Sequence, residues 1–112
     1  MEIDRDSTEY LYFGWSGDPP AVGAEVAFMA AAARPTEGDW DDAIVVDSQS
    51  HELWDDAVAS GVQGDYYVAI LVGSFGGNTV VLTGATAYQP WNRLTDTTER
   101  PIRVAPVTVE VL

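Results

Sequence analysis

The chain has 112 residues, no cysteine, no lysine and a formal net charge of −13. This length suits one domain, residues 1–112, with a packed core, and the missing cysteines exclude disulfides, thiol catalysis and cysteine-ligated zinc. A pI near 4.1 argues against direct binding of nucleic acid, which needs Lys and Arg on the phosphates, and no apolar run approaches the roughly 20 residues of a membrane span.

The negative charge is concentrated in the first part of the chain. Residues 1–65 hold fifteen of the 18 carboxylates and two of the five arginines, whereas residues 66–112 are nearly neutral. Two interpretations stay open. An acidic surface without lysine suits an extreme halophile, because molar salt shortens the screening length to about 3 Å and relieves the repulsion between charges. A high-GC genome would also favour Arg over Lys, together with Asp and Ala.

The first predicted elements are strands. Residues 1–8 are acidic and polar, unlike a signal peptide, so we expect the mature protein to be the whole chain, made in the cytoplasm. Residues 8–15 are aromatic and β-prone, and they run into the turn signal Ser-Gly-Asp-Pro-Pro. Residues 22–30 alternate at period two, which predicts a strand that could end in a short helical turn. A loop at residues 35–39 and a short strand at residues 43–46 follow.

Residues 51–60 form the only predicted helix. Ser50 can cap its start, Glu52 favours the positive end of the helix dipole and Gly61 can end it. Apolar residues at helical spacing would share one face of this helix. An edge strand over part of the segment is the open alternative.

The most continuously apolar stretch is residues 65–73 (Asp-Tyr-Tyr-Val-Ala-Ile-Leu-Val-Gly). A run of this length without alternation is typical of a central strand that is buried on both faces. Residues 75–78 (Phe-Gly-Gly-Asn) predict a hairpin turn, and residues 79–83 its partner strand.

Two further strands are predicted at residues 87–95 and 102–112. Pro90 lacks an N–H donor and so places the first of them at an edge or a bulge, and the alternation of the second slips at Pro106, which suggests another bulge. About seven short strands at spacings near ten residues predict a mainly all-β domain, an antiparallel two-sheet Ig-like β-sandwich with at most one short helix.

Residues that could carry chemistry do not form a convincing set. Ser50, His51 and Glu52 are neighbours at a helix start and point apart, whereas a catalytic triad must converge. The aspartate pairs at residues 41–42 and 55–56 have the composition of a solvated face rather than that of a hydrolase. A loosely held cation near Asp39 stays open, but its spacing is not that of an EF-hand. We therefore predict no catalytic residue, no cofactor and no dedicated metal site.

The second half carries a family resemblance. Its marks are the run Gly64–Gly73, then Gly84, then Tyr88-Gln-Pro-Trp91-Asn-Arg93-Leu-Thr-Asp96, with Glu99 and Pro101 before a last strand. This pattern resembles small virion structural proteins of tailed phages and archaeal tailed viruses. The resemblance implies an Ig-like β-sandwich and a place at the capsid surface or in the head–tail (neck) region.

The predicted function is therefore that of a non-enzymatic accessory subunit of a virion, assembled in the host cytoplasm. Its partners would be other virion proteins (major capsid, neck or tail subunits) and further copies of itself, with neither nucleic acid nor membrane as a direct partner. The predicted interface residues are aromatic or cationic: Tyr66, Tyr88, Trp91, Arg93, Arg100 and Arg103. The alternative is a free-standing β-sandwich module that binds a carbohydrate or a peptide through exposed aromatic residues.

Overall fold

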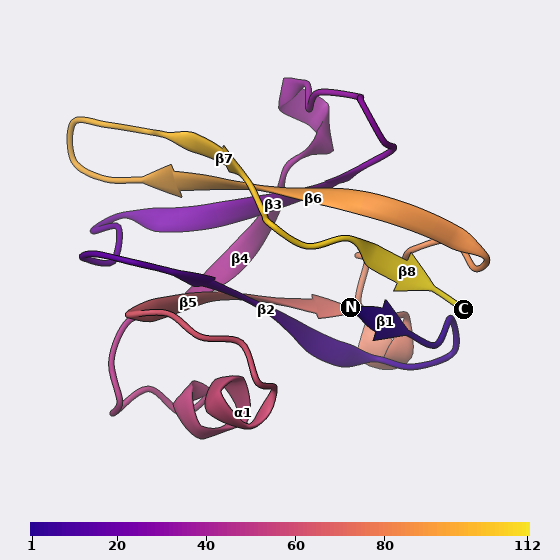
Figure 1. Cartoon of the computed structure of the whole chain (residues 1–112), viewed down its shortest axis with the longest axis horizontal. Coiled ribbons are helices and arrows are strands. Elements are labelled where there is room, and N and C mark those ends of the chain that lie inside the picture. The colour runs from indigo at the N-terminus through magenta and orange to yellow at the C-terminus, as the bar shows by residue number, and fades with distance from the viewer.

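The computed structural model describes residues 1–112, which form one β-sheet curled into a half-barrel with one short helix outside it (Figure 1). No helix of the chain is long and apolar enough to cross a membrane. The elements are β1 (Glu2–Ile3), β2 (Glu9–Trp15), β3 (Gly23–Met29), the 3-10 turn η1 (Glu37–Asp39), β4 (Asp41–Val46), α1 (Trp54–Ala59), β5 (Tyr66–Val72), the 3-10 turn η2 (Phe75–Gly77), β6 (Thr86–Thr95), β7 (Ile102–Val104) and β8 (Val109–Val111).

Strand β4 makes the bend of the half-barrel. The strand order is β1-β8-β6-β3-β4-β5-β2, with β7 also paired to β6. The first half of β4 pairs with β3, where Ala43 faces Ala24, and its second half pairs with β5, where Ile44 faces Ala69. A strand that changes partner in this way forms the corner of a curled or orthogonally packed sheet. The mainly β class is confirmed, but the two-sheet Ig-like sandwich is not, because hydrogen bonding continues through this corner.

Strand β5 is covered on both faces, as its apolar run predicts. Alternation directs Val68 and Ile70 into the half-barrel, where they join the main core, and directs Tyr67 and Ala69 outward. The outer residues pack against Ala57 of α1 in a separate apolar cluster. Five of the first six residues of β5 are therefore buried, and β5 is the central strand of its region.

The hairpin predicted after β5 is wrong. Gly76 and Gly77 adopt positive φ within η2, and residues 79–83 form no strand. The Asn78 side chain explains the difference, because its amide donates hydrogen bonds of 2.8 Å to the carbonyl oxygens of both Leu71 and Gly73. These bonds satisfy the end of β5 locally, and the returning segment keeps a single backbone bond to it, from the Gly73 N–H to the Val80 carbonyl at 2.9 Å, without forming a strand.

The helix is confirmed but is shorter than predicted. It begins at Trp54 instead of His51, because residues 51–53 form a turn in which the Leu53 N–H donates to Nδ1 of His51 at 3.1 Å. Ser50 makes no cap at the start of α1. The alternative of an edge strand in this segment is therefore wrong.

The single strand predicted over residues 102–112 with a bulge at Pro106 is instead two strands, β7 and β8, with Pro106 in the segment between them. Strand β6 is not at an edge: it pairs with β3 on one side and with β7 and β8 on the other. Pro90 lies where the partner changes from β8 to β7, and its carbonyl accepts from the Ala105 N–H at 3.0 Å. The Gln89 amide donates to the Ala105 and Val107 carbonyls at 2.8 and 3.1 Å. Pro90 thus occupies the second of its two predicted positions, a local break in the ladder.

Candidate functional site

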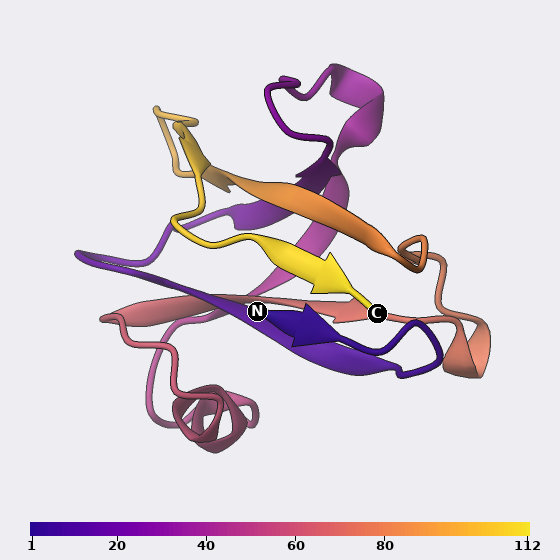
Figure 2. The same cartoon turned by 45° about the vertical axis from the view of Figure 1, so that its right-hand side comes forward.

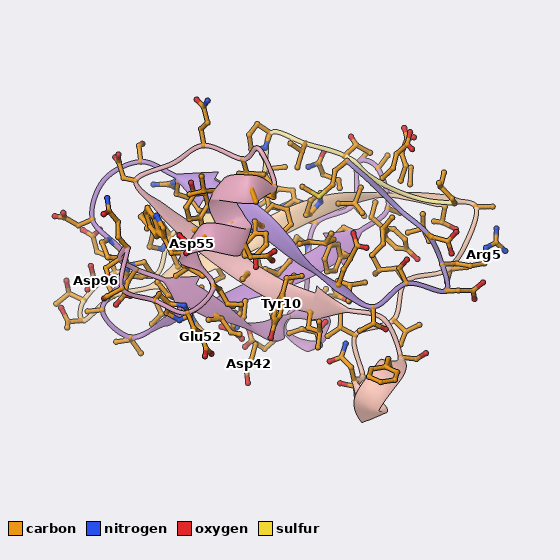
Figure 3. The ribbon with its side chains drawn as sticks, turned by 90° about the horizontal axis from the view of Figure 1, so that it is seen from below. Arg5, Tyr10, Asp42, Glu52, Asp55 and Asp96 are labelled. Atoms are coloured by element: carbon orange, nitrogen blue, oxygen red, sulfur yellow. The ribbon has the colours of Figure 1, made fainter.

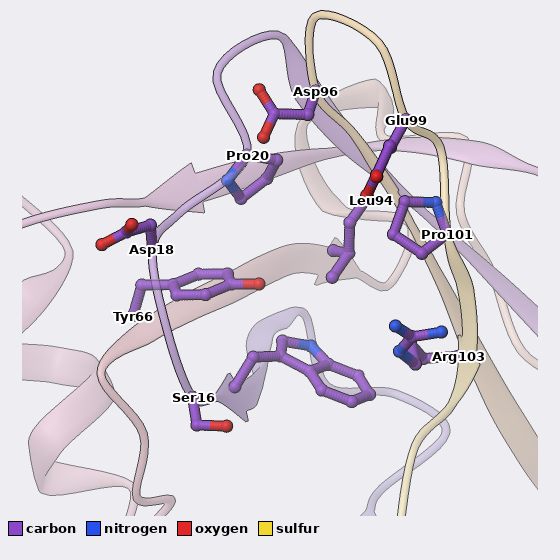
Figure 4. Close-up of a pocket in the computed structure, with 10 residues that line it drawn as sticks. Ser16, Asp18, Pro20, Tyr66, Leu94, Asp96, Glu99, Pro101 and Arg103 are labelled. Atoms are coloured by element: carbon purple, nitrogen blue, oxygen red, sulfur yellow. The ribbon is translucent and has the colours of Figure 1, made fainter.

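A cleft of about 310 Å³ opens at one end of the half-barrel (Figure 4). We call it the end cleft. It is lined by residues from the end of β2, the β2–β3 turn, the start of β5, the end of β6, the β6–β7 turn and β7: Trp15, Ser16, Asp18, Pro20, Tyr66, Leu94, Asp96, Glu99, Pro101 and Arg103. The sequence separation of these segments means that the curl of the sheet, rather than any local motif, creates the site.

Strand register brings the lining residues together. Trp15 and Tyr66 face each other across the β2–β5 pair. Arg103 of β7 lies opposite Asn92 of β6, and alternation then places Leu94 on the same inward face. The residues that line the end cleft therefore cover the core at this end of the half-barrel.

Two carboxylates fix the turns around the end cleft. The Asp65 carboxylate accepts a 2.8 Å hydrogen bond from the Gly17 N–H and so holds the β2–β3 turn. Oδ1 of Asp96 accepts from the N–H groups of Thr97 at 2.9 Å and Ala21 at 3.4 Å, which ties the β6–β7 turn to the start of β3. These bonds leave Oδ2 of Asp96 without a partner inside the chain.

The two aromatic residues of the end cleft differ in their hydrogen bonding. The Trp15 indole is anchored, because its Nε1 donates to Oδ1 of the fully buried Asn92 at 3.0 Å. Tyr66 is only 3% exposed, yet its hydroxyl has no hydrogen-bond partner in the chain and points into the cleft (Figure 4). Burial raises the pKa of this hydroxyl, while the nearby Arg103 acts in the opposite direction. Tyr66 therefore presents a neutral O–H donor to whatever enters.

The charges of the end cleft are also unpaired. Asp18, Asp96 and Glu99 contribute carboxylates, and Arg103 contributes the one guanidinium. None of them takes part in the three ion pairs of the chain, all of which involve Glu25 or Arg93. Figure 3 shows Asp96 at one end of the molecule and Arg5 at the opposite end. The cleft therefore carries an excess of negative charge on a negatively charged protein.

The predicted interface residues fall into three places. Tyr66 and Arg103 line the end cleft. Trp91, Arg93 and Arg100 lie on or beside the outer face of the β3–β6 pair. Tyr88 packs edge-to-face against Phe28, with ring centroids 6.4 Å apart, and its hydroxyl oxygen accepts from the Thr83 N–H at 2.9 Å. Their role at an interface stays a prediction, and the structure does not gather them into one surface.

Arg93 is used within the chain. Its guanidinium makes two hydrogen bonds to Glu25, of 2.9 and 2.8 Å, and two to Glu37, of 2.9 and 3.3 Å, and it lies 4.7 Å from the ring centre of Trp40. We call these four residues the outer-face clamp. The hydrogen bond from Arg93 lowers the pKa of Glu37, and the two carboxylates raise the pKa of Arg93. Arg100 joins at the edge through a 3.0 Å bond to Glu25.

The other residues weighed for chemistry are engaged locally. The Asp56 carboxylate accepts a 2.5 Å hydrogen bond from the Tyr12 hydroxyl, and burial together with this bond raises the pKa of Tyr12. Asp39 accepts from Thr36 in the η1 turn. Burial, and then the charge of Asp42, raises the pKa of Asp41. No group of three or more His, Asp or Glu side chains is arranged to hold a metal ion.

Sequence reasoning missed Trp15, Asp18, Asp96 and Glu99 as members of one site. Asp18 belongs to a recognised turn signal, and Asp96 and Glu99 flank another, but two separate turns do not predict a shared cleft. To predict that these two turns share a cleft, one would need to know that the sheet turns a corner in β4, and no local sequence pattern indicates this corner. Among known proteins, no family model, no curated protein and no solved structure matches this chain.

Proposed function

We propose that the protein is a non-enzymatic binding subunit that docks onto a partner protein through the end cleft. The observation that carries this proposal is the Tyr66 hydroxyl, which opens into the end cleft from an otherwise buried side chain and has no hydrogen-bond partner in the chain. The cleft opens this hydroxyl to solvent, so a docked partner can replace water as its hydrogen-bond partner.

The setting that we propose is a virion, in which the protein acts in several copies as an accessory subunit of the capsid surface or the neck region. The resemblance of residues 64–112 to tailed-virus structural proteins supports this setting. The acidic surface supports it as well, because a net charge of −13 disfavours adhesion to packaged nucleic acid. The role requires a rigid scaffold with a docking site, and it does not depend on an Ig-like strand arrangement.

The test is co-sedimentation of the purified chain with candidate capsid, neck and tail proteins. Tyr66→Phe should weaken a complex, because it removes the free hydroxyl while keeping the ring in the core. Tyr67→Phe is the matched control, since Tyr67 is the next residue on the same strand but faces α1. Equal binding by the two variants would contradict docking through the end cleft.

Carbohydrate binding is the second candidate. One observation favours it, namely that the Trp15 indole and the Tyr66 hydroxyl share the cleft with three carboxylates. Aromatic rings and carboxylates together can stack on a sugar and bind its hydroxyl groups. Saturable binding on a glycan array that is lost in Tyr66→Phe would favour this function over protein docking.

A further inference from the structure

We infer that the end cleft receives a cationic side chain, an arginine, from an extended segment of the partner protein. The inference rests on the proposed function and names the chemistry that the cleft would recognise. It is carried by the unpaired charges of the cleft, by its fixed aromatic wall, by the free Tyr66 hydroxyl and by an equivalent arrangement elsewhere in the chain.

The carboxylates of the end cleft favour a cation. Asp18, Asp96 and Glu99 outnumber the single guanidinium of Arg103, and no ion pair inside the chain neutralises them. Oδ2 of Asp96 is free to accept, because the backbone bonds that fix this side chain end on Oδ1. The net charge of −13 adds a long-range field that draws cations towards the protein.

The Trp15 ring provides a surface that suits the same group. Its Nε1 bond to Asn92 fixes the orientation of the indole. The quadrupole of the ring attracts a guanidinium over the face of a tryptophan, more strongly the further the pair is desolvated. The cleft of about 310 Å³ has room for one long side chain.

The outer-face clamp shows this chemistry at work within the same molecule. There Arg93 lies over Trp40 and is gripped by Glu25 and Glu37. The end cleft offers the same set of groups, one tryptophan and several carboxylates, with no ion-paired arginine among them. It is therefore equipped to hold an arginine that comes from outside.

The Tyr66 hydroxyl and Arg103 set the remaining requirements. The hydroxyl can donate a hydrogen bond to a backbone carbonyl next to the incoming arginine. Arg103 is a like charge that opposes the ligand, so its removal should strengthen binding of a cation. An anionic or zwitterionic ligand would respond to the loss of Arg103 in the opposite way.

The experiment titrates the full chain with two short blocked peptides, acetyl-Gly-Arg-Gly-amide and its citrulline analogue, which is neutral and nearly isosteric. The readout is the NMR signal of the Trp15 indole N–H, assigned with Trp15→Phe. The arginine peptide should shift this signal with at least tenfold higher affinity than the citrulline peptide, and its affinity should fall as salt rises.

Variants of the cleft sharpen the result. Glu99→Gln should weaken the arginine peptide several-fold, whereas Asp55→Asn, with the same loss of charge on the exposed side of α1, should leave its affinity nearly unchanged. Arg103→Gln should tighten binding several-fold. Weaker binding of the arginine peptide by Arg103→Gln would overturn the inference. So would an equal loss of affinity in Glu99→Gln and in the control Asp55→Asn.

The outcomes also separate this inference from the proposed function. Equal affinity for the two peptides, with partner binding still sensitive to Tyr66→Phe, would remove the cationic ligand and leave protein docking in place. If neither peptide shifts the Trp15 signal and no partner complex depends on Tyr66, both the inference and the proposed function fail.

Discussion

The outer face of β5 and the outer face of β6 are covered in opposite ways. Helix α1 covers β5 with an apolar cluster in which Tyr67 packs against Trp54, with ring centroids 5.1 Å apart. The segment around η1 covers β6 with the charged outer-face clamp of Arg93, Glu25, Glu37 and Trp40. Figure 2 shows α1 and η1 on opposite sides of the curled sheet.

This difference follows from the half-barrel itself. A sandwich buries only the inner face of each sheet, whereas the outward residues of these two strands include Tyr67 and Trp91, which need cover of their own. The apolar cover depends on buried area, so screening of charges by salt does not weaken it. The clamp depends on charge and hydrogen bonds, so salt and pH should act on it first. The end cleft takes residues from both regions, Tyr66 from β5 and Leu94 from β6, and so depends on both covers.

The largest effect is expected from the apolar cover. Tyr67→Ala should lower the free energy of unfolding by about 4 kcal/mol, because it removes a buried aromatic ring and leaves a cavity under α1. Urea denaturation measures the loss, which should be the same in dilute and in molar salt. Tyr67→Phe is the control, since the hydroxyl makes no hydrogen bond and its removal should cost little. A loss that shrinks strongly in molar salt would contradict an apolar cover.

The charged cover should respond less strongly, but with salt dependence. Arg93→Met should cost about 2 kcal/mol, less than a deeply buried pair, because Glu37, one of its two carboxylate partners, is largely exposed. Arg34→Met is the matched control on the same face: Arg34 lies 5.2 Å from the Trp91 ring centre without a carboxylate partner, and its loss should cost well under half as much. Denaturation at two salt concentrations compares them. Equal losses would show that the carboxylates of the clamp contribute little.

The sequence predicts these two covers unequally. The unbroken apolar run of β5 indicates burial on both faces, and helical spacing of apolar residues locates α1. Arg93, in contrast, reads as a surface cation, because its carboxylate partners lie 56 and 68 residues away in sequence. Pairing over such distances depends on the fold and leaves no local pattern.

The corner in β4 limits the rest of the prediction. Ala43 and Ile44 are adjacent apolar residues of a short strand, and nothing in their identity shows that they pair with different neighbours. The sandwich prediction places the strands correctly in large part and errs on how the sheet closes. The end cleft exists only because the sheet curls, so the sequence could not show that Trp15 and Glu99 line one site.

Salt should separate the two interpretations of the acidic composition. If the chain is adapted to high salt, molar NaCl should raise Tm by roughly 5–10 °C, equivalent to about 1 kcal/mol or somewhat more, because screening relieves the repulsion among its carboxylates. Calorimetry of the wild type measures this shift. Arg93→Met should gain at least as much, since it adds one unit of net negative charge. A flat response would leave genome composition as the account of the acidic surface.

The smallest effect, and the most specific to the charged cover, is its dependence on pH. The Arg93 hydrogen bond lowers the pKa of Glu37 below its ordinary value of 4.5, so the ion pair stabilises the fold above that pH and the stabilisation is lost as the pH falls through the lowered value. Glu37→Gln should therefore have a slightly lower Tm than the wild type at pH 7, and the gap should close on acidification below about pH 4.

Other carboxylates also change the Tm of both proteins on acidification. They include Asp39, whose lowered pKa acts in the same direction as that of Glu37, and Asp41, whose raised pKa acts in the opposite direction. Comparing the two proteins cancels those shared contributions, and Glu52→Gln, an exposed glutamate outside every ion pair, controls for the loss of charge alone. A gap that stays constant through the titration would mean that Glu37 holds η1 by packing and not by its charge.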